Sequence, residues 1–349
     1  MFGKKNALFL LIAVAFALPA FSGEGAALKL VQTIPIPNVT SRFDHFNMDR
    51  RDLRLFVPAE QAKVVEVIDL RQGRQAYAIP GFVMPHSIYY WAPSHELFVG
   101  DNNGTVKILR VEAHSYKQLK TVKLTLSSAG NMRFDPATQL LYIGNYRRSK
   151  TATGPDHVLL GIINVRTDRH VGDIRVPGRI MKGFAMETGG PRIFVAIKDR
   201  DAVAVINRKT RRETAQWALH GAASPYAIAL DELHHRLFVV THKPGKLIVL
   251  NSETGQQITS LPAPAGVDDA YYDAAHRRIY VSAGVGSSPQ GWIAVYRQLD
   301  ADHYQAIAPV STGAASATSL LVPKLDRYYV VAQRNGKRAA EVQVYEPEP

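Results

Sequence analysis

Residues 231–250 carry the pattern that decides the fold, and they read DELHHRLFVVTHKPGKLIVL. Asp231 is followed six residues later by the apolar triplet Leu237-Phe238-Val239, and a second apolar run follows at residues 247–250. The polar residues between the two runs are typical of a turn, and the alternation of apolar with other residues before Asp231 indicates another strand. We therefore predict consecutive short strands joined by tight turns.

The same triplet pattern recurs through the whole chain at intervals of 42 to 52 residues. Its seven members are Leu55-Phe56-Val57, Leu97-Phe98-Val99, Leu141-Tyr142-Ile143, Ile193-Phe194-Val195, Leu237-Phe238-Val239, Ile279-Tyr280-Val281 and Tyr328-Tyr329-Val330. Four short strands in each unit, with no amphipathic helix, are typical of one blade of a β-propeller. We predict an all-β, seven-bladed β-propeller that occupies residues 23–349.

The two ends of this propeller are predicted to complete one blade between them. The last triplet is followed by a single strand that ends at Tyr345, so the seventh blade lacks its outer strand. Residues 28–37 form a strand without a blade of their own, and we predict that they pair with residues 342–345. Such a closure leaves no half-blade with an unpaired edge.

Residues 1–22 are predicted to be a signal peptide that is removed from the mature protein. Lys4 and Lys5 precede an apolar run over residues 7–18, and the small residues Ala20 and Ser22 suit signal peptidase. The alternative is a membrane anchor, but the run is shorter than the roughly 20 apolar residues that a spanning helix needs. We expect a monomer that lies in the periplasm or outside the cell.

The composition excludes several classes of protein. The 349 residues contain no cysteine, which excludes a disulfide scaffold, a Cys-ligated metal centre and an acylated lipoprotein. A hydrophobic content of 46% excludes intrinsic disorder. The net charge of +12 and basic loops, such as the one with Arg147 and Arg148, favour an anionic partner: a glycan, a nucleic acid or an acidic protein. A chain this basic also carries positive charge on its other turns, so the loops alone do not define a site.

The repeat phrases Leu-Phe-Val, then Val-x-Val-Ile-Asp, then Thr-Gly resemble the YVTN-type β-propeller repeat family of secreted bacterial proteins. The resemblance covers nearly all of residues 28–345, and its motifs are specific for fold and poor for function. Proteins of this type are similar in fold to the heavy subunits of quinoprotein amine dehydrogenases and to streptogramin-lyase and lactonase propellers. The resemblance therefore implies that an enzyme is the alternative to a binding module.

Six residues before the triplet stands an acid in five of the seven units, with Trp91 and Val322 in the other two. Aligning the units on this position predicts which side chains meet at one mouth of the central channel. Five positions before this aligned position stand Asp44, His86, Gly130, Lys182, Tyr226, Asp268 and Ala317, and the next positions hold His45, Ser87, Asn131, Gly183, Ala227, Asp269 and Thr318. Titratable groups that converge at a concave mouth indicate a ligand site, although buried polar groups find partners in any channel. The candidate ligand-binding residues are Asp44, His45, His86, Asn131, Lys182, Tyr226, Asp268, Arg147 and Arg148.

Three interpretations of these aligned side chains at the channel mouth are open. His86 acting as a general base oriented by Asp44, with Lys182 stabilising an oxyanion, would suit a lyase or a lactone hydrolase. Asp44, His86 and Asp268 could bind a divalent cation, but no His-x-His or HExxH spacing supports a metal, and no cofactor is predicted. Binding of an anionic or polar ligand without turnover is the interpretation that we adopt.

Overall fold

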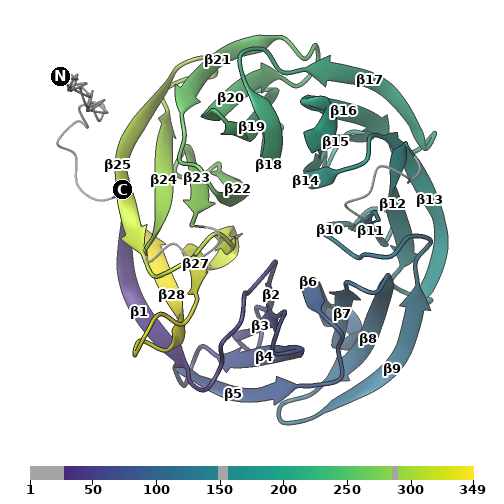
Figure 1. Ribbon diagram of the computed structural model, residues 1–349, viewed down its shortest axis with the longest axis vertical. Helices are drawn as coiled ribbons and strands as arrows, with labels where there is room; N and C mark the ends of the chain where they lie inside the picture. Colours follow the sequence, from purple (N-terminus) through teal and green to yellow (C-terminus); the bar gives the residue numbers. More distant parts are fainter. Residues whose placement is uncertain (1–26, 148–155, 285–289) are drawn as a thin grey trace, which may run out of the picture.

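The computed structural model describes residues 27–147, 156–284 and 290–349, and the described chain forms seven four-stranded antiparallel sheets around a central channel (Figure 1). From the channel outward, the first three blades are β2 (Asn47–Asp49), β3 (Arg54–Ala59), β4 (Val64–Asp69) and β5 (Arg74–Ile79); β6 (Pro85–Trp91), β7 (Glu96–Asp101), β8 (Thr105–Val111) and β9 (Tyr116–Lys123); and β10 (Met132–Asp135), β11 (Leu140–Asn145), β12 (His157–Asn164) and β13 (Arg169–Pro177). The next three are β14 (Met181–Met186), β15 (Arg192–Ile197), β16 (Ala202–Asn207) and β17 (Arg212–Ala218); β18 (Ala223–Asp231), β19 (Arg236–Lys243), β20 (Gly245–Asn251) and β21 (Gln257–Pro262); and β22 (Val267–Asp273), β23 (Arg278–Ala283), β24 (Gly291–Gln298) and β25 (Tyr304–Thr312). The prediction of a seven-bladed propeller is confirmed.

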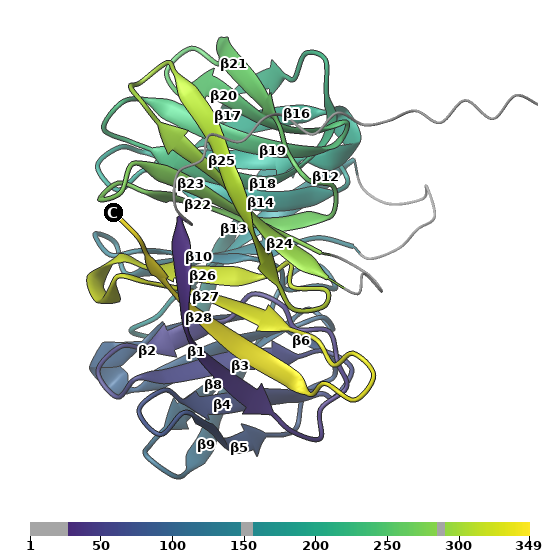
Figure 2. The same ribbon diagram turned by 90° about the vertical axis from the view of Figure 1, so that its left-hand side faces the viewer.

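The seventh blade consists of β26 (Ser319–Val322), β27 (Arg327–Ala332), β28 (Ala340–Pro347) and, as its outer strand, β1 (Leu28–Ile36). Strands β1 and β28 run antiparallel side by side, with Leu28 opposite Pro347 and Ile36 opposite Ala340 (Figure 2). Arg278 of the sixth blade donates to the carbonyl oxygens of Ala27 at 3.1 Å and Pro349 at 3.0 Å, which holds both ends of the described chain in place. The predicted closure of the ring is confirmed.

The repeated triplet lies in the second strand of every blade, where both faces are covered by neighbouring sheets. In the first blade Leu55, Phe56 and Val57 have no exposed surface. Because neighbouring sheets pack against both faces of such a strand, its residues are apolar without interruption and do not alternate with polar ones. The triplet is therefore the signature of the core between blades.

The acid that ends an inner strand closes the turn into the second strand. Asp49 Oδ1 accepts a hydrogen bond from the backbone N–H of Arg51 at 3.0 Å, and Asp273 Oδ1 accepts one from Ala275 at 3.1 Å. This Asx turn holds the chain in a sharp reversal. Because every inner strand leads outward through the same antiparallel order of strands, the inner strands all run in one direction along the channel. One end of the channel, which we call the mouth, receives their first residues, and the far end receives their last.

Helical structure in the described residues is confined to the short 3₁₀ turns η1 (Ala92–Ser94), η2 (Lys198–Arg200) and η3 (Pro323–Leu325). Over that same part of the chain, no helix has the length and hydropathy that crossing a membrane requires. The predicted signal peptide, residues 1–22, lies outside the described residues.

Candidate functional site

A cavity of about 430 Å³ opens at the mouth, and we call it the mouth cavity. Six of the seven blades contribute to its lining, which consists of Arg42, Asp44, His45, Glu60, His86, Asn102, Gly130, Asn131, Gly144, Tyr146, Arg147, Arg179, Ile180, Met181, Lys182, Gly183, Tyr226 and Asp268. The lining includes eight of the nine residues that the sequence suggested as ligand-binding. The ninth, Arg148, lies outside the described residues. The seven-fold alignment thus placed side chains from distant parts of the sequence around one cavity.

The segment before β2 brings two carboxylates together. The backbone N–H of Asp44 donates to Pro58 O at 3.3 Å, and that of Glu60 donates to Arg42 O at 3.0 Å. These bonds hold the segment against the end of β3, so both carboxylates reach the mouth, where their residues are 1% and 4% exposed. A further backbone bond, from Ile88 N–H to His45 O at 3.0 Å, fixes the second blade and its His86 beside them.

Two imidazoles and three carboxylates form a chain of contacts across the mouth. His86 Nδ1 lies 3.0 Å from Asp44 Oδ2 and 2.9 Å from Glu60 Oε1. His45 Nε2 lies 3.2 Å from Asp44 Oδ1, and its Nδ1 lies 3.2 Å from Asp269 Oδ1 on the sixth blade. Asp44 therefore bridges both imidazoles, and the pair His45–Asp269 spans the channel.

The charges in this chain determine the protonation of both imidazoles. Burial alone would lower the pKa of His45, but the carboxylates of Asp269 and Asp44 raise it to about 9. Burial of His86 is likewise outweighed by Asp44 and Glu60, which hold its pKa well above the usual value. The two imidazoles in turn hold the pKa of the Asp44 carboxyl below its usual range, against the effect of its burial. Both histidines are therefore cations at neutral pH.

The opposite side of the mouth cavity is formed by lysine and tyrosine side chains. Lys182 Nζ donates to Tyr226 Oη at 2.8 Å, and Lys198 Nζ lies 5.2 Å from the centre of the tyrosine ring. His242 stacks on Tyr226 with 4.1 Å between ring centres, and its Nε2 donates to Val267 O at 2.8 Å. Burial lowers the pKa of Lys182. These contacts fix the ammonium group of Lys182 at the cavity wall.

Asp268 is a carboxyl group that keeps its acceptor and donor capacity for a ligand. Among the described residues, no hydrogen bond or ion pair engages its side chain, although the carboxyl lines the mouth cavity. Burial and the nearby charge of Asp44 raise the pKa of Asp268 to about 6. A small fraction of this group is therefore protonated at neutral pH.

Positive charge predominates in the lining of the mouth cavity. Six of its side chains are cationic at neutral pH, namely Arg42, His45, His86, Arg147, Arg179 and Lys182. Three lining side chains are carboxyl groups, namely Asp44, Glu60 and Asp268. With Asp269, which pairs with His45 beside the lining, the cations still outnumber the carboxyl groups, and a concave site with such an excess attracts anions.

Asp44, His45 and His86 also offer donor atoms that could hold a metal ion, since these atoms lie within 4.8 Å of one another. The carboxyl of Asp268, the third candidate ligand from the sequence, is not part of this group. The imidazole protons already satisfy the carboxylates, so a cation would have to displace them before it could bind.

Several residues of the site were not singled out from the sequence. Arg42, Glu60 and Arg179 lie in connections that the seven-fold alignment does not cover. The position of Glu60 carries a signal, because the second strand runs back toward the mouth and Glu60 follows its last residue. The sequence gives no sign of the pairing between His45 and Asp269, because the two residues belong to non-adjacent blades.

Several basic side chains on the loops form ion pairs with acids and contribute little free charge. Arg200 Nη2 lies 2.9 Å from Asp156 Oδ1, and Arg338 Nε donates to Glu341 Oε2 at 3.2 Å. Arg147 and Arg179 are exposed at the rim of the mouth cavity instead. The cavity is thus a better-defined cationic site than the loop face as a whole.

No protein-family model matches the sequence, and a search of curated proteins found no match. Among solved structures, a chain of a mitotic checkpoint complex is similar over 99% of this chain and 99% of its own length, with a TM-score of 0.74 and 14% sequence identity. Hydrazine synthase of Kuenenia stuttgartiensis is similar over 69% of this chain and 80% of its own, with a TM-score of 0.59 and 11% identity. At such identities the likeness is one of fold, and the chain is similar to proteins of very different activity. The comparisons therefore establish a β-propeller and leave its function to be argued from the mouth cavity.

Proposed function

We propose that this protein is a binding module that takes a small anionic ligand, such as an acidic sugar, into the mouth cavity. The observation that carries the proposal is the convergence of six cationic side chains on one cavity that holds three carboxyl groups. Lys182, Arg147 and Arg179 would pair with the anionic group. His86 has no described partner at Nε2, and Asp268 and Asn131 offer further polar atoms, so hydroxyl groups of the ligand would find donors and acceptors.

The protonation of His86 favours binding over catalysis. A general base needs a free lone pair at neutral pH, and an imidazole that is held as a cation by Asp44 and Glu60 has none to offer. The lyase or lactone-hydrolase alternative therefore has less support than the binding module.

The repeat phrases support a second part of the proposal, namely that the chain is an exported propeller of the YVTN type. Residues 1–22 have the charge and apolar run of a signal peptide. An exported propeller would meet its ligand in the periplasm or outside the cell.

Glucuronate is a suitable first probe, and glucose is its neutral counterpart. We expect isothermal titration calorimetry to detect one glucuronate per chain and to find glucose at least about tenfold weaker, since a charge-assisted hydrogen bond contributes about 1.5 to 3 kcal/mol. Lys182→Met should weaken glucuronate binding by a similar factor. Lys209→Met, on the turn between β16 and β17 at the far end, should not change it.

The proposal fails if neither glucuronate nor citrate binds, or if Lys182→Met and Lys209→Met have equal effects. Binding of heparin by the wild type and by Lys182→Met alike, without binding of the small anions, would instead assign the affinity to the basic loops. Raising the salt concentration should weaken heparin binding steeply in that case, because condensed counterions are released from the polyanion.

Removal of divalent cations separates the binding module from a metal protein. We expect EDTA to leave the glucuronate affinity and the melting temperature unchanged, because protons and not a metal neutralise the carboxylates at the mouth. The measurement is a thermal unfolding scan with EDTA, zinc or manganese. A rise in melting temperature with zinc, accompanied by proton release, would show that Asp44, His45 and His86 bind the metal.

A further inference from the structure

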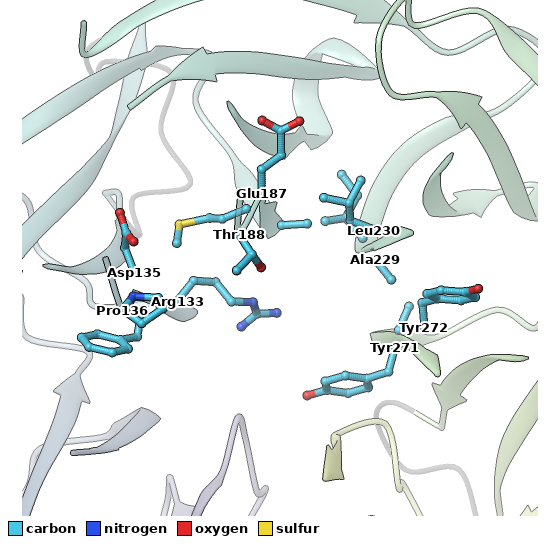
Figure 3. A pocket seen from close by; sticks show the side chains of 14 residues that line it. Arg133, Asp135, Pro136, Glu187, Thr188, Ala229, Leu230, Tyr271 and Tyr272 are labelled. Atoms are coloured by element: carbon cyan, nitrogen blue, oxygen red, sulfur yellow. The ribbon is translucent and has the colours of Figure 1, made fainter. Parts of the chain in front are cut away.

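A second pocket, of about 260 Å³, lies at the opposite end of the channel, and we call it the far-end pocket. Its walls are the last residues of the inner strands β10, β14, β18 and β22 (Figure 3). The mouth cavity is built from residues at the beginnings of inner strands. No residue lines both. The far-end pocket is therefore a separate candidate site, and the ligand proposed for the mouth cavity does not account for it.

Arg133 on β10 extends into the far-end pocket toward the space bounded by Thr188 and Tyr271 (Figure 3). Its Nη1 donates to Met132 O at 2.9 Å, and its guanidinium carbon lies 5.7 Å from the centre of the Phe184 ring. Among the described residues, no carboxylate pairs with Arg133. A guanidinium has five N–H donors, so most of the donors of Arg133 remain available to a ligand.

The two carboxylates in the lining of the far-end pocket are engaged by other arginines. Asp135 Oδ2 lies 3.3 Å from Arg208 Nε, and Glu187 Oε1 accepts from Arg192 Nε at 2.7 Å. These pairs neutralise the acids and hold them away from Arg133. The pocket is left with one uncompensated positive charge.

Beside these charged groups, the far-end pocket offers an apolar and aromatic surface. Phe134, Met186, Leu230, Tyr271 and Tyr272 line it. Tyr271 Oη is already engaged, since it donates to Ser319 O at 2.9 Å, so the ring and not the hydroxyl is offered to a ligand. A cavity of about 150 Å³ holds benzene, so the far-end pocket has room for an aromatic ring that also carries a carboxylate.

From these features we propose that the far-end pocket binds a small aromatic carboxylate, with the carboxylate on Arg133 and the ring against Phe134 and Tyr271. The planar fork of a guanidinium matches a carboxylate with two parallel hydrogen bonds, which a neutral amide cannot reproduce. The apolar walls select a ligand with a ring, because a small hydrophilic anion would leave them in contact with water.

Benzoate is the probe, and benzamide is its neutral counterpart of the same shape. Calorimetric titration of the whole protein should detect one benzoate per chain and should find benzamide at least about tenfold weaker, the factor that corresponds to one charge-assisted hydrogen bond. Arg133→Met should reduce benzoate affinity at least about tenfold, because it removes this charge-assisted hydrogen bond. Arg166→Met, an exposed arginine on a turn of the same blade, should leave the affinity unchanged.

A second variant tests the site without altering its charge. Thr188 is exposed at the rim of the far-end pocket, so Thr188→Trp should fill the entrance and abolish benzoate binding while the melting temperature is retained. The proposal is overturned if benzamide binds as well as benzoate, if folded Arg133→Met or Thr188→Trp binds benzoate like the wild type, or if Lys182→Met at the mouth removes the binding instead. The last result would place benzoate in the mouth cavity, so failure here leaves the proposed function standing.

Discussion

Replacing Ile34 and Ile36 together by alanine is expected to lower the free energy of unfolding by about 4 to 8 kcal/mol, because each truncation of a buried isoleucine costs about 2 to 5 kcal/mol and neighbouring sites are not fully additive. Both side chains lie on β1, neither has exposed surface, and both belong to the apolar cluster that contains Val342 and Leu55. They therefore pack the closing strand against the last blade and the first blade at once. Urea unfolding followed by circular dichroism measures the loss.

Two other residues of the same strand supply the control. Leu30 and Val31 are 47% and 41% exposed, so replacing both by alanine should change the unfolding free energy by no more than about 0.5 kcal/mol each. A small effect of the Ile34 and Ile36 double variant, equal to that of the control, would contradict the view that β1 is a structural part of the ring.

Asp44→Asn is expected to lower the unfolding free energy by about 3 to 5 kcal/mol at pH 7, the usual cost of removing one partner from a buried ion pair. The substitution takes away the charge that His45 and His86 share. The pKa of His45 is raised from a reference value of 6.5 to about 9 in the folded protein. The contribution of its charge to the stability of the fold is therefore complete below pH 6.5 and is lost as the pH rises through 9. The difference between wild type and variant should therefore shrink above pH 9.

Denaturant unfolding at pH 6, 7.5 and 10 measures this dependence, and Glu346→Gln is the control. Glu346 forms an exposed pair with Arg327, 3.5 Å away, and such a pair contributes at most about 1 kcal/mol. A difference for Asp44→Asn that stays constant from pH 6 to 10 would contradict the assignment of two cationic imidazoles at the mouth.

The sequence predicted the fold in detail because each of its features has a local cause. A triplet such as Leu55-Phe56-Val57 marks a strand that is covered on both faces, and an acid such as Asp49 marks the turn before it. The number of triplets gives the number of blades. The single strand after the last triplet requires a partner from the other end of the chain. Repetition makes these signals reinforce one another.

The lining of the mouth was predictable for the same reason, whereas the contacts within it were not. The alignment gives the position of a residue along its inner strand, so it could gather Asp44, His86 and Asp268 at one end. It contains no information on which residues meet across the channel, and His45 with Asp269 is such a contact. The uncompensated charge of Arg133 was missed because it depends on where Asp135 and Glu187 find their partners.

The closure between β1 and β28 also determines the order in which the molecule can assemble. It joins Leu28 to Pro347, almost the full length of the described chain, whereas the other blades are made of consecutive strands. Contacts between residues close in sequence form quickly, and those between distant residues form slowly. Six blades can thus form from consecutive strands, but the ring stays open until β28 is available to pair with β1. Until then β1 has no sheet to join, and Ile34 and Ile36 stay in contact with water, so the C-terminal strand is what buries the N-terminal one.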